Sequence, residues 1–526
     1  MPPTFDTLDP WTLSASVLQV MAAAFVFVVG LAALMLVVLF ACDRIQTADA
    51  IRRNYPVIGR FRGLFTRLGE FFRQYFFAMD REELPCNRAQ RDWVARAAEG
   101  RGNTVAFGST RNTAVPGTPI FANAAYPPLA GSAQPAPMTI GPGTRHPYTA
   151  PSLFNISGMS FGAVSRPAVE ALSHGAARAG IWLNTGEGGL SPCHLDGGCD
   201  IVFQIGTANY GVRTSDGALC EDRLHAVAAH AQVRMFEIKL SQGGKPGKGG
   251  ILPGAKVTPE IAAVRGIPIG EDSVSPNRRP DVNSDATLLD LIAHLRAVTG
   301  KPVGIKCVAG HMDDFAALFA TIAARGPDSA PDFITLDGGE GGTGAAPLPL
   351  IDLVGMSIRE ALPLLADMRA AHGLENRIRL IASGKLSHPG DVAWALAAGA
   401  DFVTSARGFM FALGCIQALK CNRNTCPTGI TTHNPRLQRG LVAEAKSDKV
   451  ARYARGVLAE VAMIAQAVGV GDPRALRRRH VRIVQPGGRS VPMDCLFPGR
   501  AAKATVPAQA AARPVPQLSP GVSSSP

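Results

Sequence analysis

The sequence predicts an α/β fold: a closed (β/α)8 TIM barrel with an N-terminal transmembrane helix and a membrane-proximal extension. Three observations predict it. Residues 151–440 alternate regularly between short apolar runs and Ala- and Leu-rich stretches. Glycine-rich or charged segments follow most of the apolar runs. A long uncharged run lies close to the N-terminus. The first two observations concern the barrel, and the third concerns the membrane segment.

The alternation in residues 151–440 has the pattern of strands joined by crossover helices. Parallel strands need such crossovers, because a tight turn cannot join them. The clear strand candidates are 154–157, 181–185, 235–240, 303–308, 333–337, 378–383 and 402–406, with a further one expected around 202–206. The expected helices are 168–179, 287–298, 315–324, 358–371 and 389–398. Eight strands favour a closed barrel over an open doubly wound sheet.

The N-terminal region, residues 1–42, is expected to form a short tail and one transmembrane helix. No charged residue occurs from Pro10 to Cys42, and a helix needs ~20 apolar residues to cross a bilayer. A cleaved signal peptide is the alternative. It would begin with basic residues, whereas the charged side chains here are Asp6 and Asp9. Arginines follow the apolar run, so the positive-inside rule predicts a single-pass membrane protein whose barrel lies in the cytoplasm.

The other segments are assigned from composition. Residues 43–150 are basic and then rich in Pro and Gly, and are expected to form a membrane-proximal connector and a cover for the barrel. Residues 441–500 are expected to form a helical extension, and residues 501–526 a disordered tail rich in Ala, Pro and Ser. The net charge of +12 is partly concentrated in Arg clusters at 44–73 and 474–482. One cluster adjoins the membrane segment and the other is a helix end leading into a strand, so we expect no nucleic-acid binding.

The unusual residues of the barrel follow its strands, which is where barrels of this kind place their reacting groups. These segments include residues 158–162, 186–189, 243–247, 338–339 and 384–385. Glycine lets backbone N–H groups approach a planar ring or a phosphate closely, because no Cβ intervenes. One such segment alone would be an ordinary turn. Their repetition on one rim indicates a ligand-binding face.

Three cysteines, Cys415, Cys421 and Cys426, lie within twelve residues, and Pro427 follows the last of them. A zinc site would need a distant fourth ligand. Thiolates at this spacing are typical of an iron–sulfur cluster, in which a closing Cys-Pro is familiar. Three ligands indicate a three-iron cluster, or a four-iron cluster with one open corner. Ordinary buried thiols are the alternative.

Four segments together resemble the FMN-binding synthase domain of glutamate synthase. They are GCIQALKCNRNTCPTG, TGEGG, KLSQGGKPGKGG and LDGGEGGTGAAP. The resemblance covers about residues 80–440, and it extends to the stand-alone, membrane-attached proteins grouped with that family. It implies an oxidoreductase acting on CH–NH₂ groups, FMN as cofactor, and a [3Fe–4S] cluster held by Cys415, Cys421 and Cys426.

The resemblance also implies which residues hold the flavin. Residues 158–162 would line the ring, and Lys306 would lie by its pyrimidine side and stabilise negative charge on the reduced ring. Backbone groups of the glycine loops would hold the phosphate. The implied cofactor-binding residues are Gly158, Met159, Ser160, Gly162, Lys306, Asp337, Gly338, Gly339, Gly384, Ser405, Ala406 and Arg407.

The substrate residues are implied in the same way. Gln242, Lys245 and Arg265 match the positions that hold 2-oxoglutarate in the family, and an Arg with a Lys suits a dicarboxylate. Glu187 and Lys245 would be catalytic, with Glu187 handling the proton of the imine or amine. A turn or helix-cap acid is the alternative role for Glu187. Electrons would pass from the cluster to FMN and then to 2-iminoglutarate, giving L-glutamate.

Two departures from complete glutamate synthases bear on partners. We see no glutaminase domain with an N-terminal nucleophilic Cys, so free ammonium or a separate glutaminase is expected. Residues 339–344 fit G-x-G-x-x-G, but Pro347 and Pro349 are expected to obstruct the helix of a dinucleotide site. An external donor, ferredoxin or a reductase subunit, is therefore expected. Two rival functions remain open: a membrane-attached FMN and iron–sulfur dehydrogenase of another amino or oxo acid, and a non-catalytic membrane-anchored scaffold.

Overall fold

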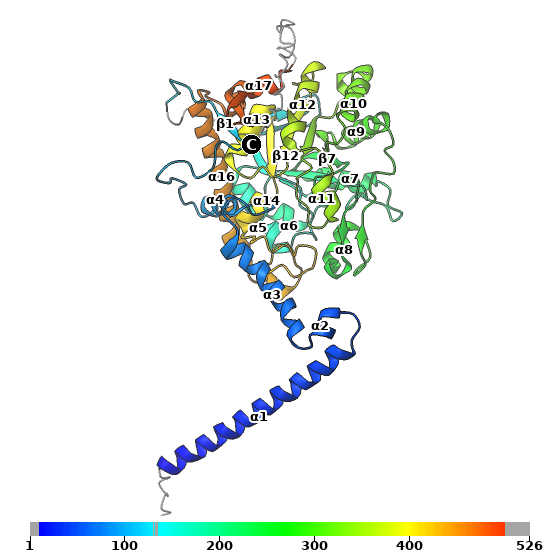
Figure 1. The fold of residues 1–526 in the computed structure, drawn as a ribbon. Helices are drawn as coiled ribbons and strands as arrows, with labels where there is room; N and C mark the ends of the chain where they lie inside the picture. The colour runs from blue at the N-terminus through cyan, green and yellow to red at the C-terminus, as the bar shows by residue number, and fades with distance from the viewer. Residues whose placement is uncertain (1–9, 130, 132–134, 500–526) are drawn as a thin grey trace, which may run out of the picture. The chain divides into compact units, whose positions relative to one another are not determined.

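The computed structural model describes residues 10–129, 131 and 135–499 (Figure 1). The chain divides into two compact units, Met1–Arg88 and Ala89–Pro526. The predicted disordered tail, residues 501–526, lies outside the described residues.

The first unit is helical. Its helices are α1 (Pro10–Ile45), α2 (Ala50–Asn54) and α3 (Ile58–Phe72), followed by a π-helical turn, η1 (Arg73–Phe77). The predicted apolar N-terminal helix is therefore found. Its segment Ser14–Ile45 is long and apolar enough to cross a membrane, by length and composition alone, a test that a signal sequence also passes. Crossing of the membrane remains a prediction.

The second unit contains a closed barrel of eight parallel strands, which confirms the predicted fold class. In chain order the strands are β4 (Phe154–Ile156), β5 (Leu183–Asn184), β6 (Ile201–Ile205), β7 (Val233–Lys239), β10 (Val303–Val308), β11 (Phe333–Asp337), β12 (Arg379–Ser383) and β13 (Phe402–Ser405). Strand β13 pairs with β4, which closes the barrel. Strand β6 confirms the eighth expected strand.

The predicted crossover helices are also confirmed. They are α5 (Arg166–Ala179), α9 (Asp285–Thr299), α10 (Met312–Arg325), α12 (Ile358–Ala371) and α13 (Pro389–Ala398). Local sequence sets their ends. Helix α9 begins at Ser284, whose side chain accepts a hydrogen bond from the Thr287 N–H, and it ends at Gly300 with φ 70°.

Shorter elements complete the second unit. Its other helices are α4 (Arg88–Ala98), α6 (Pro192–Asp196), α7 (Glu221–Ala229), α8 (Pro259–Arg265), α11 (Leu348–Leu353), α14 (Arg407–Leu413), α15 (Pro435–Gln438), α16 (Ala443–Val468) and α17 (Met493–Leu496). Its other strands are β1 (Pro119–Phe121), β2 (Met138–Ile140), β3 (Tyr148–Ala150), β8 (Ile251–Leu252), β9 (Ser273–Val274), β14 (Val481–Val484) and β15 (Ser490–Pro492).

A hairpin and a layer of large side chains fill the N-terminal end of the barrel. Strands β2 and β3 pair antiparallel, and Ile140 and Tyr148 from this hairpin join a buried cluster with Trp182, Phe333 and Phe402. The three aromatic residues stand at or next to the first residue of their strands. The barrel is therefore a packed core with its other end, at the carboxyl ends of the strands, left for a site.

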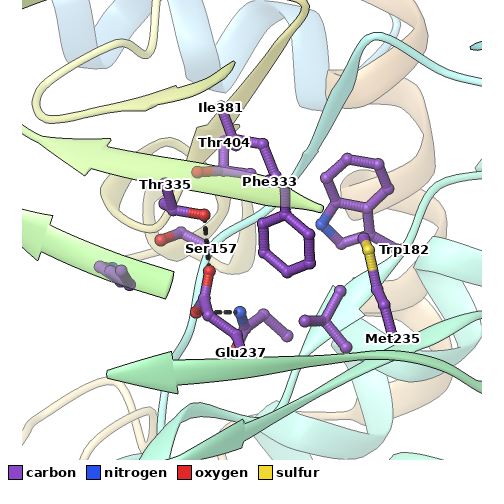
Figure 2. Close-up of a pocket in the computed structure, with 11 residues that line it drawn as sticks. Ser157, Trp182, Met235, Glu237, Phe333, Thr335, Ile381 and Thr404 are labelled. Carbon is purple, nitrogen blue, oxygen red and sulfur yellow. Dashed lines mark hydrogen bonds between the residues drawn. The ribbon is translucent and has the colours of Figure 1, made fainter. Parts of the chain in front are cut away.

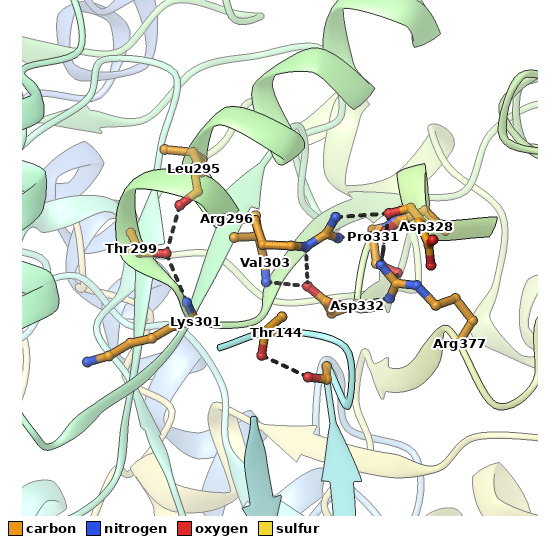
Figure 3. Close-up of polar contacts among 12 residues, drawn as sticks. Thr144, Leu295, Arg296, Thr299, Lys301, Val303, Asp328, Pro331, Asp332 and Arg377 are labelled. Atoms are coloured by element: carbon orange, nitrogen blue, oxygen red, sulfur yellow. Dashed lines mark hydrogen bonds and ion pairs between the residues drawn. The ribbon is translucent and has the colours of Figure 1, made fainter. Parts of the chain in front are cut away.

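A buried carboxylate ties strands and helices together at the same end of the barrel (Figure 3). Asp332, which is 1% exposed, precedes β11. Its Oδ2 accepts hydrogen bonds from the Val303 N–H at 2.7 Å and from Arg296 Nε at 3.1 Å. Its Oδ1 accepts one from Arg377 Nη1 at 2.7 Å. Both arginines also donate to the Ala330 carbonyl. One carboxylate thus holds β10, β11, α9 and the start of β12 in register.

The C-terminal segment packs against the barrel. Helix α16 lies so close to α5 that a Cβ at Gly175 would stand 2.5 Å from the Val450 Cβ. Strand β14 confirms the strand expected at 481–484. The second Arg cluster is structural: the Arg478 Nη1 lies 2.8 Å from Asp367 Oδ1, and the Arg474 guanidinium lies 4.6 Å from the Phe402 ring centroid.

One expectation about the G-x-G-x-x-G segment is wrong. Pro347 and Pro349 were expected to obstruct a helix, yet α11 starts directly after Pro347. Proline is tolerated in a first helical turn, where its missing N–H would have had no partner in any case. The helix has only six residues.

Candidate active site at the barrel mouth

A buried polar layer lies inside the barrel, between the aromatic residues at its N-terminal end and its mouth, the open end at the carboxyl ends of the strands. Glu237 on β7 is its centre and is 2% exposed. Its Oε1 accepts hydrogen bonds from Asn184 Nδ2 at 2.8 Å and from Gln204 Nε2 at 2.6 Å. Its Oε2 accepts one from Thr335 Oγ1 at 2.6 Å. Figure 2 shows Glu237 and Thr335 facing one another across from the Phe333 and Trp182 rings. The remaining cavity, about 10 Å³, has room for about one water.

Lys306 lies at the edge of this layer. Its Nζ is 3.6 Å from Asp337 Oδ2, and both side chains are buried. Burial by itself would lower the pKa of Lys306, but the carboxylates of Asp337 and Glu237 outweigh it and raise the pKa above its ordinary value. Lys306 is therefore a fixed positive charge inside the barrel. Asp337 also accepts the Gly243 N–H at 3.0 Å, which ties the loop after β7 to β11.

A second charged group is built around Glu187, in the turn after β5. Its Oε2 lies 3.2 Å from Lys239 Nζ, and it is 9% exposed. Burial would raise the pKa of Glu187, but the charges of Lys239, Lys245 and Arg265 hold it below its ordinary value. Glu187 is therefore a carboxylate at neutral pH. It is packed tightly, because a Cβ at Gly206 would lie 2.7 Å from its Oε2.

Lys245 belongs to the same group. It is 7% exposed. Burial, and then the like charge of Lys239, lower the pKa of Lys245 to about 8, and Glu187 opposes the shift. A lysine with this pKa can exchange a proton near neutral pH and remains positive below it. The structure thus brings the two predicted catalytic residues, Glu187 and Lys245, into one electrostatic cluster.

Arg265 approaches this cluster from α8 and is held by protein groups. Its Nη2 donates to the Phe161 carbonyl at 3.0 Å and its Nη1 to Ser273 Oγ at 3.3 Å. Its guanidinium carbon lies 5.1 Å from the Tyr210 ring centroid. Its Nε is buried and meets no acceptor within the described residues. The guanidinium is therefore rigid and supplies positive charge at short range. Gln242, the other predicted substrate residue, is half-buried in the loop after β7.

The loops after β4 and β5 touch across the mouth. A Cβ at Gly158 would lie 2.8 Å from Asn184 Oδ1, so only glycine fits above the polar layer. Gly186 has φ 64°, and a Cβ there would lie 2.5 Å from the backbone N of Ser160. Met159 and Ser160 are half-buried, and Gly162 has φ 99°. The predicted flavin-lining segment therefore stands directly over the Glu237 layer.

In two of the predicted phosphate-binding glycines, the backbone N–H already donates a hydrogen bond to another part of the protein. The Gly338 N–H donates to the Ser383 carbonyl at 2.9 Å, and the Gly339 N–H donates to the Met356 carbonyl at 2.7 Å. Their lack of a Cβ serves loop packing instead, since a Cβ at Gly339 would lie 2.5 Å from the Gly355 carbonyl oxygen. With both N–H groups paired inside the loops, the phosphate role of Gly338 and Gly339 stays a prediction.

The other predicted phosphate residues keep free donors. In the part of the chain that the structure describes, the N–H groups of Gly384, Ala406 and Arg407 meet no acceptor. Gly384 has φ 117°, which a side chain would strain. Ser405 Oγ accepts the Gly408 N–H at 3.3 Å. Arg407 donates to the Glu340 carbonyl at 3.1 Å. An anion at the ends of β12 and β13 would meet three unpaired amides, so the residues present fit a phosphate.

The three-cysteine loop follows α14. Lys256 Nζ donates to the Cys421 carbonyl at 3.3 Å and to the Ala163 carbonyl at 2.9 Å, which joins this loop to the segment after β4. Burial would raise the pKa of the Cys426 thiol, but hydrogen bonds from Thr428 and Thr431 hold it below its ordinary value. Thiolate is the ligand form of cysteine.

The three cysteine thiols are suitable ligands for an iron–sulfur cluster, but the structure does not show them placed together around one metal site. Cys415 and Cys421 are half-buried, and Cys426 is buried. Within residues 10–129, 131 and 135–499, no group of three or more His, Cys, Asp or Glu side chains is placed to hold a metal ion.

Sequence reasoning missed several residues of the site: Glu237, Lys239, Asn184, Gln204 and Thr335. They lie within strands, whereas the prediction from sequence rested on residues that follow the strands. One signal was available. Glu237 and Lys239 are charged residues two positions apart in the largely apolar segment 235–240, so they share a face. In a closed barrel, that shared face is the interior.

The comparison with known proteins decides the family. The family described as "Conserved region in glutamate synthase" matches residues 133–471. The chain belongs to the glutamate synthase family. It is 37% identical over 520 residues to the glutamate synthase large subunit-like protein YerD of Bacillus subtilis, covering 91% of this chain and 98% of that one.

Two further relatives match a smaller share of the chain. The archaeal glutamate synthase [NADPH] of Methanocaldococcus jannaschii is 35% identical over 330 residues, covering 62% of this chain and 61% of that one. The glutamate synthase [NADPH] large chain of Bacillus subtilis is 33% identical over 323 residues, covering 60% of this chain and 20% of that one. The family match over residues 133–471 includes the barrel strands, which carry the candidate site.

Proposed function

We propose that this protein is an FMN-dependent oxidoreductase that forms L-glutamate by reduction of 2-iminoglutarate, derived from 2-oxoglutarate and ammonia. The cluster of Glu187 with Lys239, Lys245 and Arg265 carries the proposal. One anion among three cations leaves a net charge of about +2 at a buried mouth. A dicarboxylate of charge −2 neutralises that excess, and its desolvation is offset by short-range cations. Membership of the glutamate synthase family supports this substrate.

The residues at the mouth also fit FMN. The free N–H groups of Gly384, Ala406 and Arg407 would hold its phosphate, and residues 158–162 would line its ring. Lys306 would supply positive charge beside the ring. FMN bound there supplies hydride chemistry. The protein's own part is to orient the substrate carboxylates with Lys245 and Arg265, assisted by Gln242, and to exclude water.

Proton handling divides between two residues. Glu187 is held as a carboxylate and accepts hydrogen bonds from the amine or imine nitrogen. Lys245, with a pKa of about 8, can donate a proton to the substrate as the C=N bond is reduced. The balanced reaction adds two electrons and the corresponding protons to 2-iminoglutarate, which forms from 2-oxoglutarate and ammonia with loss of water.

The electron path and partners are further parts of the proposal. Cys415, Cys421 and Cys426 would hold a [3Fe–4S] cluster, and the Lys256 bridge between their loop and Ala163 supports its place beside the site. An external donor, ferredoxin or a reductase subunit, would reduce the protein. Ammonia would come from free ammonium or a separate glutaminase.

The apolar helix α1 supports a single-pass membrane anchor with a cytoplasmic barrel.

Ligand titration tests the site directly. Purified protein loaded with FMN should change its flavin absorbance on addition of 2-oxoglutarate. Lys245→Ala should weaken this binding at least tenfold, because a buried charge partner is lost. Lys248→Ala is the matched control, since Lys248 is exposed and only three residues away, and it should bind as the unchanged protein does. Equal binding by both variants would contradict the proposed substrate site.

A further inference from the structure

Helix α3 carries an apolar stripe that the described residues of its own unit, residues 10–88, leave uncovered. Along its length the apolar residues fall on one side, on an arc of about 140° at 100° per residue. They are Ile58, Phe61, Leu64, Phe65, Leu68, Phe71 and Phe72, each 38% to 72% exposed. No residue of α3 is buried. The following turn adds exposed Tyr75, Phe76 and Phe77. A soluble surface rarely leaves so continuous an apolar patch in water.

The opposite side of α3 is basic and small. Thr66, Arg67 and Glu70 lie there, together with Gly59 and Gly63. Arg60 and Arg62 stand at the two borders of the apolar stripe, given 100° per residue. Long arginine side chains at such borders can keep their stems along apolar surface and reach a polar layer with the guanidinium. This is the charge pattern of a helix that lies in a membrane interface.

The start of α3 is fixed to the end of α1. Asp43, in the last turns of α1, is 1% exposed. It accepts hydrogen bonds from Arg60 Nε at 2.8 Å and from the Val57 N–H at 2.9 Å. If α1 spans a bilayer, its end lies at the headgroup level, and these bonds hold the first turn of α3 at the same level. The apolar stripe therefore begins where an interface would be.

We propose that α3 lies in the plane of the cytoplasmic membrane interface. Its phenylalanines and leucines enter the acyl boundary, and its arginines contact anionic phospholipid headgroups. This inference goes beyond the proposed reaction, and it rests on the proposed membrane anchor. The occupant of the stripe is lipid, because the stripe combines an apolar centre, basic borders and a start tied to the end of an apolar helix.

Tryptophan quenching in bilayers tests this placement in the full-length chain. Trp11 is first replaced by Phe, since the remaining native Trp93, Trp182 and Trp394 are buried within the barrel unit. Phe65→Trp then reports the stripe, and Thr66→Trp, the adjacent residue on the basic side, is the matched control. Lipids with brominated acyl chains should quench the new fluorescence of Phe65→Trp at least about twofold more than that of Thr66→Trp. Aqueous acrylamide should show the reverse order.

The lipid headgroup is tested in the same samples. Bilayers containing phosphatidylglycerol should give deeper quenching of Phe65→Trp than pure phosphatidylcholine, and added salt should reduce the difference. Equal quenching in both lipids would overturn the anionic-headgroup part. Equal access of acrylamide to both positions, or protection of both from both quenchers, would overturn the interfacial placement. Extraction of the chain from membranes at alkaline pH separately tests the anchor, so failure of the anchor and failure of α3 are distinguishable.

Discussion

At the scale of single residues, the mouth is defined by how charges are paired. The carboxylates of Asp337 and Glu237 raise the pKa of Lys306 despite its burial, whereas burial and then the like charge of Lys239 lower the pKa of Lys245. Two lysines with pKa values shifted in opposite directions indicate two tasks. Lys306 is a permanent charge, and Lys245 is a residue that can change its protonation state.

The pH dependence of the reaction should follow Lys245. Its pKa of about 8 means that the protonated form is lost as the pH rises through 8. Glutamate formation should therefore fall about tenfold per pH unit above pH 8. Lys245→Arg keeps the positive charge but not the titration, so its residual activity should not fall in that range. A pH–rate profile of both proteins checks this, and an unchanged alkaline fall in Lys245→Arg would assign it to another group.

Glu237 should support the barrel as well as the site. Glu237→Gln places an amide where Asn184, Gln204 and Thr335 all donate, so one buried donor loses its acceptor. The free energy of unfolding should fall by about 1–3 kcal/mol. Denaturant unfolding of the FMN-free protein measures it. Glu360→Gln, on an exposed helix position, is the control and should change stability by less than about 0.5 kcal/mol.

The residues of the site were only partly predictable from sequence. Glu187 and Lys245 come after strand ends, where a barrel exposes its reacting groups, so position alone singled them out, whereas Lys306 lies inside β10. Glu237 and Lys239 belong to β7 itself, and only their spacing of two residues, which puts both on one face, pointed to the barrel interior. Gly338 and Gly339 looked like anion-binding glycines. Their N–H groups are taken by Ser383 and Met356, which depends on loop contacts that the sequence does not show.

At the scale of elements, burial made the strands predictable. All eight strands are short and bounded by turns, and β7, β10 and β11 are buried along nearly their whole length. Strands that are buried on both faces have nearly continuous apolar sequences, which makes them recognisable in the sequence. Helix α11 was not predicted, because prolines were expected to block a helix. Proline destabilises the interior of a helix, but in the first turn its φ angle is compatible with helical structure.

The Asp332 junction should be an element-scale determinant of stability. Asp332→Asn removes the charge that both Arg296 and Arg377 face, which leaves two cations with poorer partners near the barrel base. The free energy of unfolding should decrease by about 3 kcal/mol or more. Thermal unfolding followed by circular dichroism provides the measurement. Asp328→Asn, in the adjacent exposed turn, should have little effect. Equal stability of the two variants would contradict the role given to Asp332.

At the scale of the whole molecule, the two compact units predict separable behaviour. The barrel and its cover lie in Ala89–Pro526, and the apolar helix lies in Met1–Arg88. A chain that lacks residues 1–77, and with them both α1 and the apolar stripe of α3, should therefore no longer require detergent, while it still binds FMN with unchanged affinity. Sedimentation with membranes and flavin fluorescence provide the two readouts. Loss of FMN binding on this truncation would show that the barrel depends on the N-terminal unit.

The central claim is that a glutamate synthase-type reaction occurs at the charged mouth. The most direct measurement incubates anaerobic, FMN-loaded protein with reduced ferredoxin or an artificial donor, 2-oxoglutarate and ¹⁵N-ammonium. The account predicts ¹⁵N-labelled L-glutamate in amounts that exceed the protein, and its loss in Lys245→Ala but not in Lys248→Ala. Flavin that is fully reduced, yet yields no labelled glutamate and is not reoxidised by 2-oxoglutarate with ammonium, would contradict it.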